Sequence, residues 1–149
     1  KLPMHEITDR VNKMLGFVGL NADEVINMLP EQLSGGMQRR VAIGRALLST
    51  DPQIMLYDEP TTGLDPQATV KIINLINKLH DEKHICSIMV THQIADALAV
   101  GDRFVVVVAG EVAFDGSLEQ LRDSASPPVL EFLTPFRESF QRVQRKRFA

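Results

Sequence analysis

Two acidic residues follow directly after a short apolar run in the middle of the chain. Residues 54–57 read Ile-Met-Leu-Tyr, and Asp58 and Glu59 come next. A short continuous apolar run is typical of a parallel strand buried on both faces, and open parallel sheets bind ligands beyond the carboxyl ends of their strands. An aspartate there can hold Mg²⁺ directly or through water, and a glutamate beside it can deprotonate an attacking water. A solvated acidic pair without a function is the alternative.

A second cluster combines a serine with two glycines, Ser34, Gly35 and Gly36, just ahead of a helical pattern. Ser34 suits the N-cap position of that helix. The start of a helix exposes backbone N–H groups and carries the positive pole of the helix dipole, so it can receive a phosphate. Glycines allow the phosphate to approach closely. A plain loop is the alternative for these three residues.

Two further polar residues stand near predicted element ends. His92 follows the apolar run 85–90 by two residues. We expect it at the same edge of the sheet as Glu59, where it could contact a terminal phosphate; a structural histidine is the alternative. Asp65 directly precedes Pro66 and is explained adequately as the N-cap of the next helix.

The apolar pattern indicates the elements that position these clusters. It predicts, in chain order, a helix over 7–18, a helix from the 34–36 cluster through Ser49, a strand over 54–57, a helix from Asp65, a strand over 85–90 and a helix over 94–100. Strands that alternate with helices in this way form a parallel sheet, which is an α/β fold. The stripe that the helix from Asp65 is expected to bury consists of Val70, Ile73, Ile76 and Leu79.

The last third of the chain changes character. Residues 104–108 and 111–114 flank Ala109-Gly110, which predicts a hairpin. Ser117, with Gln120 three residues later, forms the pattern of a capping box and predicts another helix.

The composition is that of a globular protein: 149 residues, 44% hydrophobic and 23% charged, with a net charge of −3. This charge does not favour nucleic acid as a partner. Cys86, the single cysteine, excludes a disulfide within the chain and is predicted to be a small core residue. The apolar runs are far shorter than the roughly 18 residues of a membrane span. Residues 135–149 hold five basic residues and one acidic residue; a frayed, solvated terminus is predicted, with contact to an anionic partner as the alternative.

The order and spacing of the clusters resemble the ABC ATPase family. Residues 33–47, LSGGMQRRVAIGRAL, look like the family's signature motif and its helix. Residues 54–60, IMLYDEP, look like the Walker B strand, residues 61–66, TTGLDP, like the D-loop, and residues 90–92, VTH, like the switch histidine. The resemblance runs from about Glu31 to Gly116.

The resemblance implies ATP and Mg²⁺ as ligands and a role for each matching residue. Asp58 would position Mg²⁺, Glu59 would be the general base, and His92 would sense the γ-phosphate. It also implies a head-to-tail dimer with a second ATPase subunit, in which two sites are shared.

Other residues would act across that dimer. Ser34, Gly35 and Gly36 would contact the γ-phosphate of ATP bound to the opposing subunit, and Asp65 would cross the interface. Met37 departs from the pattern, because the family most often has glutamine at this position. The role of that side chain is therefore not carried over.

The P-loop of the family, G-x-x-x-x-G-K-[ST], has no match, since no Gly-Lys pair occurs in the printed sequence. We therefore expect the N-terminal part of the domain to be absent and these residues to be inactive by themselves. The expected α/β fold is a partial P-loop NTPase with a parallel sheet at its core, and we expect the chain to divide into three parts. They are a remnant of the helical subdomain with the signature motif (1–50), a RecA-like core (51–116) and a C-terminal helical tail (117–149).

Residues 62–65 read Thr-Gly-Leu-Asp, where translation-associated ABC factors typically carry Asn-His-Leu-Asp, and this difference favours a transporter over a soluble ABC ATPase. Transmembrane permease subunits are therefore expected partners. The expected location is cytoplasmic, at the inner face of the membrane. Residues 29–37 and 129–133 carry a looser resemblance to ATPases of Mla/Mce-type lipid trafficking. The alternatives are a non-catalytic module that supplies only a signature surface, and a fragment of a soluble ABC ATPase.

Overall fold

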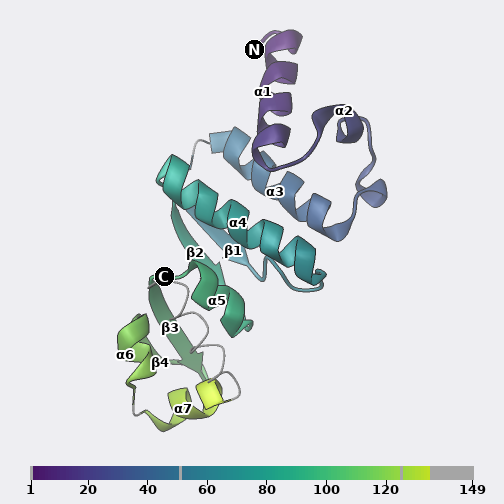
Figure 1. Ribbon diagram of the computed structural model, residues 1–149. Helices are drawn as coiled ribbons and strands as arrows, with labels where there is room; N and C mark the ends of the chain where they lie inside the picture. Colours follow the sequence, from purple (N-terminus) through teal and green to yellow (C-terminus); the bar gives the residue numbers. More distant parts are fainter. Residues whose placement is uncertain (1, 51, 125, 135–149) are drawn as a thin grey trace, which may run out of the picture. The chain divides into compact units, whose positions relative to one another are not determined.

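The chain forms two compact units, Lys1–Val90 and Thr91–Ala149, in a computed structural model (Figure 1). The structure describes residues 2–50, 52–124 and 126–134. The basic tail at 135–149 lies outside the described residues, and the predicted division into three functional parts stays a prediction. Among the described residues, no helix is both long enough and apolar enough to cross a membrane.

The first unit begins with helices. They are α1 (Met4–Phe17), α2 (Ala22–Val25), the short 3-10 turn η1 (Pro30–Gln32) and α3 (Gly35–Thr50). The predicted helices 7–18 and 34–49 correspond to α1 and α3. The segments α2 and η1 were not predicted, because neither is long enough to show a helical period.

A parallel β-α-β unit follows. Strand β1 (Ile54–Asp58) leads into α4 (Pro66–Lys83) and then into β2 (Cys86–Val90). The two strands pair in parallel, with Ile54 opposite Cys86 and Asp58 opposite Val90. The predicted parallel arrangement is therefore confirmed.

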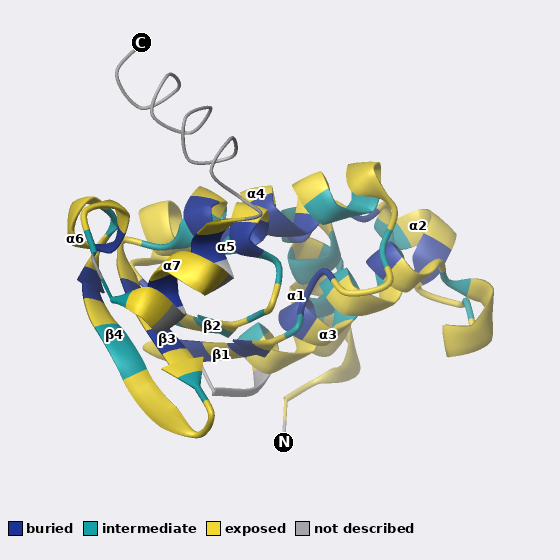
Figure 2. Cartoon of the chain, turned by 90° about the horizontal axis from the view of Figure 1, so that it is seen from below, coloured by how far each residue is buried: buried dark blue, intermediate teal, exposed yellow. Residues whose placement is uncertain are grey.

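The prediction that both strands are buried on two faces is wrong. Met55 and Tyr57 are buried, whereas Leu56 is 74% exposed and Val90 is 61% exposed. Figure 2 shows the same alternation of exposed and buried residues along β1. The described residues of this unit leave one sheet face uncovered. An apolar run marks a strand but does not reveal whether both of its faces receive a partner.

Two residues that were predicted to be in the core, Cys86 and Val70, are exposed. Cys86 pairs with Ile54 on the uncovered face and is exposed, so it is not a core residue. Val70 is 56% exposed. The buried stripe of α4 consists of Ile72, Ile73, Leu75, Ile76 and Leu79. At 100° per residue, Val70 lies roughly 160° around the helix from Ile72 and so faces solvent.

The second unit is built on the predicted hairpin. Its elements are α5 (Ile94–Val100), β3 (Arg103–Val108), β4 (Glu111–Ser117), α6 (Leu118–Arg122) and α7 (Pro127–Leu133). Strands β3 and β4 are antiparallel, and Ala109 and Gly110 connect them with φ angles of +51° and +83°. Positive φ at both central residues defines a type I′ turn, whose twist matches that of the strands.

The helices of this unit close over the hairpin. The core consists of Ile94, Leu98, Phe104, Val106, Leu121, Val129 and Leu133. The predicted capping box is confirmed: the backbone N–H of Ser117 donates to Gln120 Oε1 at 2.8 Å, and the N–H of Gln120 donates to Ser117 Oγ at 3.3 Å.

Candidate functional site

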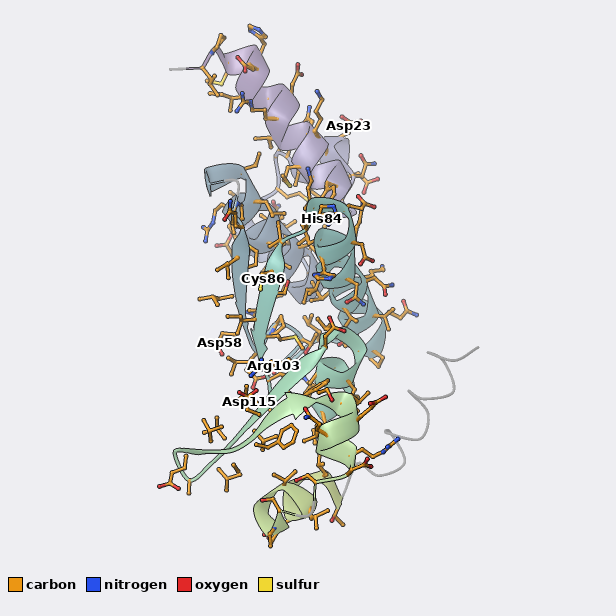
Figure 3. All side chains as sticks on the ribbon, turned by 90° about the vertical axis from the view of Figure 1, so that its left-hand side faces the viewer. Asp23, Asp58, His84, Cys86, Arg103 and Asp115 are labelled. Atoms are coloured by element: carbon orange, nitrogen blue, oxygen red, sulfur yellow. The ribbon has the colours of Figure 1, made fainter. Side chains whose placement is uncertain are left out.

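The acidic pair lies where β1 ends. Asp58 is the last residue of the strand and is exposed (Figure 3). Glu59 is half-buried, and its backbone N–H donates to the carbonyl oxygen of Val90 at 2.9 Å. Its φ angle is +44°, a region that residues other than glycine rarely adopt. The chain therefore turns sharply at Glu59, directly beyond the carboxyl end of the sheet.

A tight turn joins this pair to α4. The Thr62 hydroxyl donates to Glu59 Oε2 at 2.8 Å, and the backbone N–H of Leu64 donates to the carbonyl of Thr61 at 3.1 Å. Thr61 is buried, which anchors the turn in the unit. Thr62 was not among the residues predicted from the sequence, because its contact with Glu59 depends on the sharp turn at Glu59.

Asp65 caps α4, as predicted. Its Oδ1 accepts from the backbone N–H of Gln67 at 2.9 Å and from that of Ala68 at 3.0 Å. The bond from Ala68, followed by the bond from Gln67, holds the pKa of Asp65 below its ordinary value despite an opposing effect of desolvation. The carboxylate thus stabilises the start of α4 in its charged form.

The signature residues lie at the start of α3. Ser34 Oγ accepts from the backbone N–H of Met37 at 3.3 Å, which confirms Ser34 as the N-cap. A Cβ on Gly36 would lie 2.9 Å from the Cβ of Ala68 in α4, closer than atoms pack. Gly36 is therefore required by the contact between α3 and α4 in addition to any phosphate.

The structure thus brings two predicted clusters together. A Cβ on Gly35 would lie 3.3 Å from Leu64 Cδ2, so the signature residues sit beside the end of the D-loop turn. The signature residues and the acidic pair both belong to the first unit. The turn from Glu59 to Asp65 leads from the acidic pair to Leu64, which lies beside Gly35.

Two polar side chains hold the signature segment in place, and neither was predicted to do so from the sequence. Arg40 Nη1 donates to the carbonyl of Gly19 at 2.6 Å, and its Nε donates to that of Gly36 at 3.3 Å. Burial lowers the pKa of Arg40. Gln38 Nε2 donates to the carbonyls of Pro30 at 2.8 Å and Leu33 at 3.1 Å. The contact of Arg40 with Gly19 spans 21 residues, so no local pattern predicts it.

His92 belongs to the second unit. It is exposed and lies two residues before α5, next to a turn in which the N–H of Gln93 donates to Thr91 Oγ1 at 3.0 Å. The predicted proximity of His92 to Glu59 stays a prediction.

The acidic pair fits a magnesium site that has few protein ligands. Within the described residues, no group of three or more histidine, cysteine or acidic side chains could hold a metal ion. Mg²⁺ is usually bound by one or two carboxylates together with substrate phosphates, and not by a cage of protein ligands. The exposed carboxylate of Asp58, at the sheet edge, has the chemistry that this mode of binding requires.

Comparison with known proteins identifies the family. The profile of the ABC transporter family matches residues 4–62. Two solved structures of one dimeric ATP-binding cassette, one of them in a post-hydrolysis state bound to ADP and phosphate, align with a TM-score of 0.68 and 37% identity. The chain belongs to the ABC transporter ATP-binding family. The predicted family and α/β fold are confirmed.

Curated relatives agree with this assignment. The methionine import ATP-binding protein MetN 2 of Bacillus cereus is 42% identical over 118 residues, which are 79% of this chain and 34% of that protein. The sulfate/thiosulfate import ATP-binding protein CysA of Nocardia farcinica is 39% identical over 91% of this chain and 39% of its own length. The chain thus spans less than half the length of these relatives, and it covers 50% of the solved cassette.

Proposed function

We propose that these residues belong to the ATP-hydrolysing subunit of an ABC transporter. The observation that carries the proposal is the placement of Glu59, whose backbone is fixed beyond the carboxyl end of β1 and whose carboxylate accepts a hydrogen bond from Thr62. A held carboxylate at a sheet edge suits a base that acts on a water molecule. The similarity to import ATPases supports the same activity.

Each residue of the site has a proposed task. Glu59 takes a proton from the attacking water, and the Asp58 carboxylate holds Mg²⁺ beside it. The ion, when bound, neutralises charge on the phosphate oxygens. The proposed task of His92 is to contact the γ-phosphate. These tasks follow the family resemblance, and the geometry of the acidic pair is compatible with them.

The remaining site residues act on a second subunit in this proposal. The helix start formed by Ser34, Gly35 and Gly36 offers backbone N–H groups to the γ-phosphate of ATP held by a partner ATPase. Asp65 borders the same surface. Transmembrane permease subunits are the proposed membrane partners, and the cytoplasmic face of the membrane is the proposed location.

The transported molecule is not assigned. The relatives reported above are named for import of methionine and of sulfate or thiosulfate. The lipid-trafficking resemblance of residues 29–37 and 129–133 gains no support from these names and stays a prediction.

The test is Glu59→Gln in the full-length protein. This substitution keeps the shape of the side chain and removes its basicity, so ATP turnover should fall by about 10²–10⁴-fold. ATP binding should persist, and an ATP-bound dimer should accumulate because hydrolysis no longer releases it. Glu82→Gln is the matched control, since Glu82 is exposed near the end of α4; its turnover should be unchanged.

A second variant separates the two halves of the site. Ser34→Arg places a bulky cation at the start of α3, so the dimer should fail to form even with ATP bound. Near-normal turnover in Glu59→Gln would overturn the assignment of the base. ATP-dependent dimerisation without hydrolysis in the unmodified protein would favour the non-catalytic module instead.

A further inference from the structure

The turn between β1 and α4 holds a threonine whose two polar groups both contact Glu59. Thr62 Oγ1 donates to Glu59 Oε2 at 2.8 Å, and the backbone N–H of Thr62 donates to the carbonyl oxygen of Glu59 at 3.4 Å. A hydroxyl that donates to a carboxylate makes a charge-assisted bond, which is stronger than a bond between neutral groups.

The backbone of Glu59 is already fixed without this hydroxyl. Its φ angle is +44°, and its N–H donates to the carbonyl of Val90 at 2.9 Å. Sparsely populated conformations of this kind persist where the surrounding structure determines them. The backbone therefore sets where the side chain of Glu59 starts, while the rotations of the side chain itself decide where the carboxylate points.

We propose that Thr62 is the positioning residue that orients the Glu59 carboxylate for its reaction with water. Threonine suits this task because its branched Cβ restricts χ1, so the hydroxyl is held ready before the bond forms. Serine offers the same hydroxyl on a freer side chain. The inference rests on the proposed function, in which Glu59 is the base.

If Thr62 only stabilised the turn, removal of its hydroxyl would lower the melting temperature. The other contacts of the turn argue against such a role. The turn is also closed by the bond from the N–H of Leu64 to the carbonyl of Thr61 at 3.1 Å, and Thr61 is 1% exposed. Removal of an exposed hydroxyl at position 62 leaves those contacts in place. The turn should therefore survive the change, and the loss should appear in the catalytic rate.

The test uses Thr62→Val and Thr62→Ser in the full-length protein. Valine has the shape of threonine without the hydroxyl, so kcat should fall about ten- to a hundredfold, as expected when a charge-assisted bond is lost in the reacting state. The KM for ATP and the melting temperature should stay unchanged. Thr62→Ser should recover most of kcat. Thr8→Val is the control, since Thr8 donates to the carbonyl of Met4 in α1, away from the site.

A double substitution separates this inference from the proposed function. In a Glu59→Gln background, Thr62→Val should cause little further loss, because the hydroxyl acts through Glu59. Near-normal turnover in Glu59→Gln would overturn the base assignment itself. A large loss in Glu59→Gln together with unchanged kcat in Thr62→Val would overturn only the positioning role. A lowered melting temperature in Thr62→Val with no recovery by serine would also overturn it.

Discussion

Asp65 makes the start of α4 sensitive to pH. Its pKa is held below the ordinary value by the backbone N–H groups of Ala68 and Gln67. A carboxyl group with a lowered folded-state pKa adds stability at any pH above its unfolded value, about 3.9, and this stability is lost as the pH falls through the lowered folded value. Asp65→Ala should therefore lower the melting temperature at pH 7, and the difference should shrink in acid.

Asparagine provides the control for this prediction. Asp65→Asn keeps an oxygen that can accept from the same N–H groups but does not titrate, and asparagine is as good an N-cap as aspartate. Its melting temperature should show less dependence on acid than that of the unmodified chain. An alanine variant whose deficit stays constant from pH 7 to pH 2 would contradict a titrating cap.

The contact between α3 and α4 depends on the absence of a side chain at Gly36. A Cβ there would lie 2.9 Å from the Cβ of Ala68. Overpacking of this kind costs about 1–3 kcal/mol, and the better helix propensity of alanine returns at most about 1 kcal/mol. Gly36→Ala should therefore lower the free energy of unfolding, as measured by denaturant titration.

Gly16 offers a matched comparison in another helix. A Cβ on Gly16 would meet nothing within 4 Å, so Gly16→Ala in α1 should leave stability unchanged or raise it. Adding Ala68→Gly to Gly36→Ala should restore the packing at the contact. Equal effects of the two single glycine substitutions would show that close approach of the helices is not the reason for Gly36.

Local chemistry predicted the ends of elements well. Asp65, Ser34 and Ser117 were each predicted as N-caps, and each accepts the expected backbone hydrogen bond. A cap involves residues two or three apart, so the sequence contains all of its parts. The hairpin at Ala109-Gly110 was predicted for the same reason.

Burial and tertiary contacts were predicted less well. The runs 54–57 and 85–90 predicted fully buried strands, yet Leu56 and Val90 are exposed. Whether a strand face is covered depends on elements elsewhere in the fold. The bond from Arg40 to Gly19 spans 21 residues and has no local pattern. At the site, the acidic pair was predicted from its position after a strand, whereas the contact of Thr62 with Glu59 depends on the sharp turn at Glu59.

The 149 residues lack any Gly-Lys pair and so contain no P-loop to cradle the β- and γ-phosphates of ATP. Expressed by themselves, they should bind ATP weakly and hydrolyse it negligibly. Calorimetry and a phosphate-release assay would measure both, with the full-length protein as the reference. Turnover near the ~1–100 s⁻¹ of phosphoryl-transfer enzymes such as kinases would contradict this expectation.

The uncovered face of the two-stranded sheet should make the melting temperature of these 149 residues depend on protein concentration. Ile54, Leu56, Ile88 and Val90 are 58%, 74%, 52% and 61% exposed on that face. An apolar surface of this kind favours self-association, and association of folded chains raises the apparent melting temperature by mass action. The midpoint should therefore rise as the protein is concentrated.

A charge placed on the sheet face should remove this dependence. Leu56→Lys should flatten the rise of the midpoint with concentration and shift the chain toward monomer in sedimentation. Val70→Lys is the matched control, because Val70 is 56% exposed on α4 and away from the sheet face. If the unmodified chain sediments as a monomer with a midpoint that dilution does not change, the sheet face does not drive association. If the sheet face does drive association, a melting temperature measured for these residues applies only at the protein concentration used.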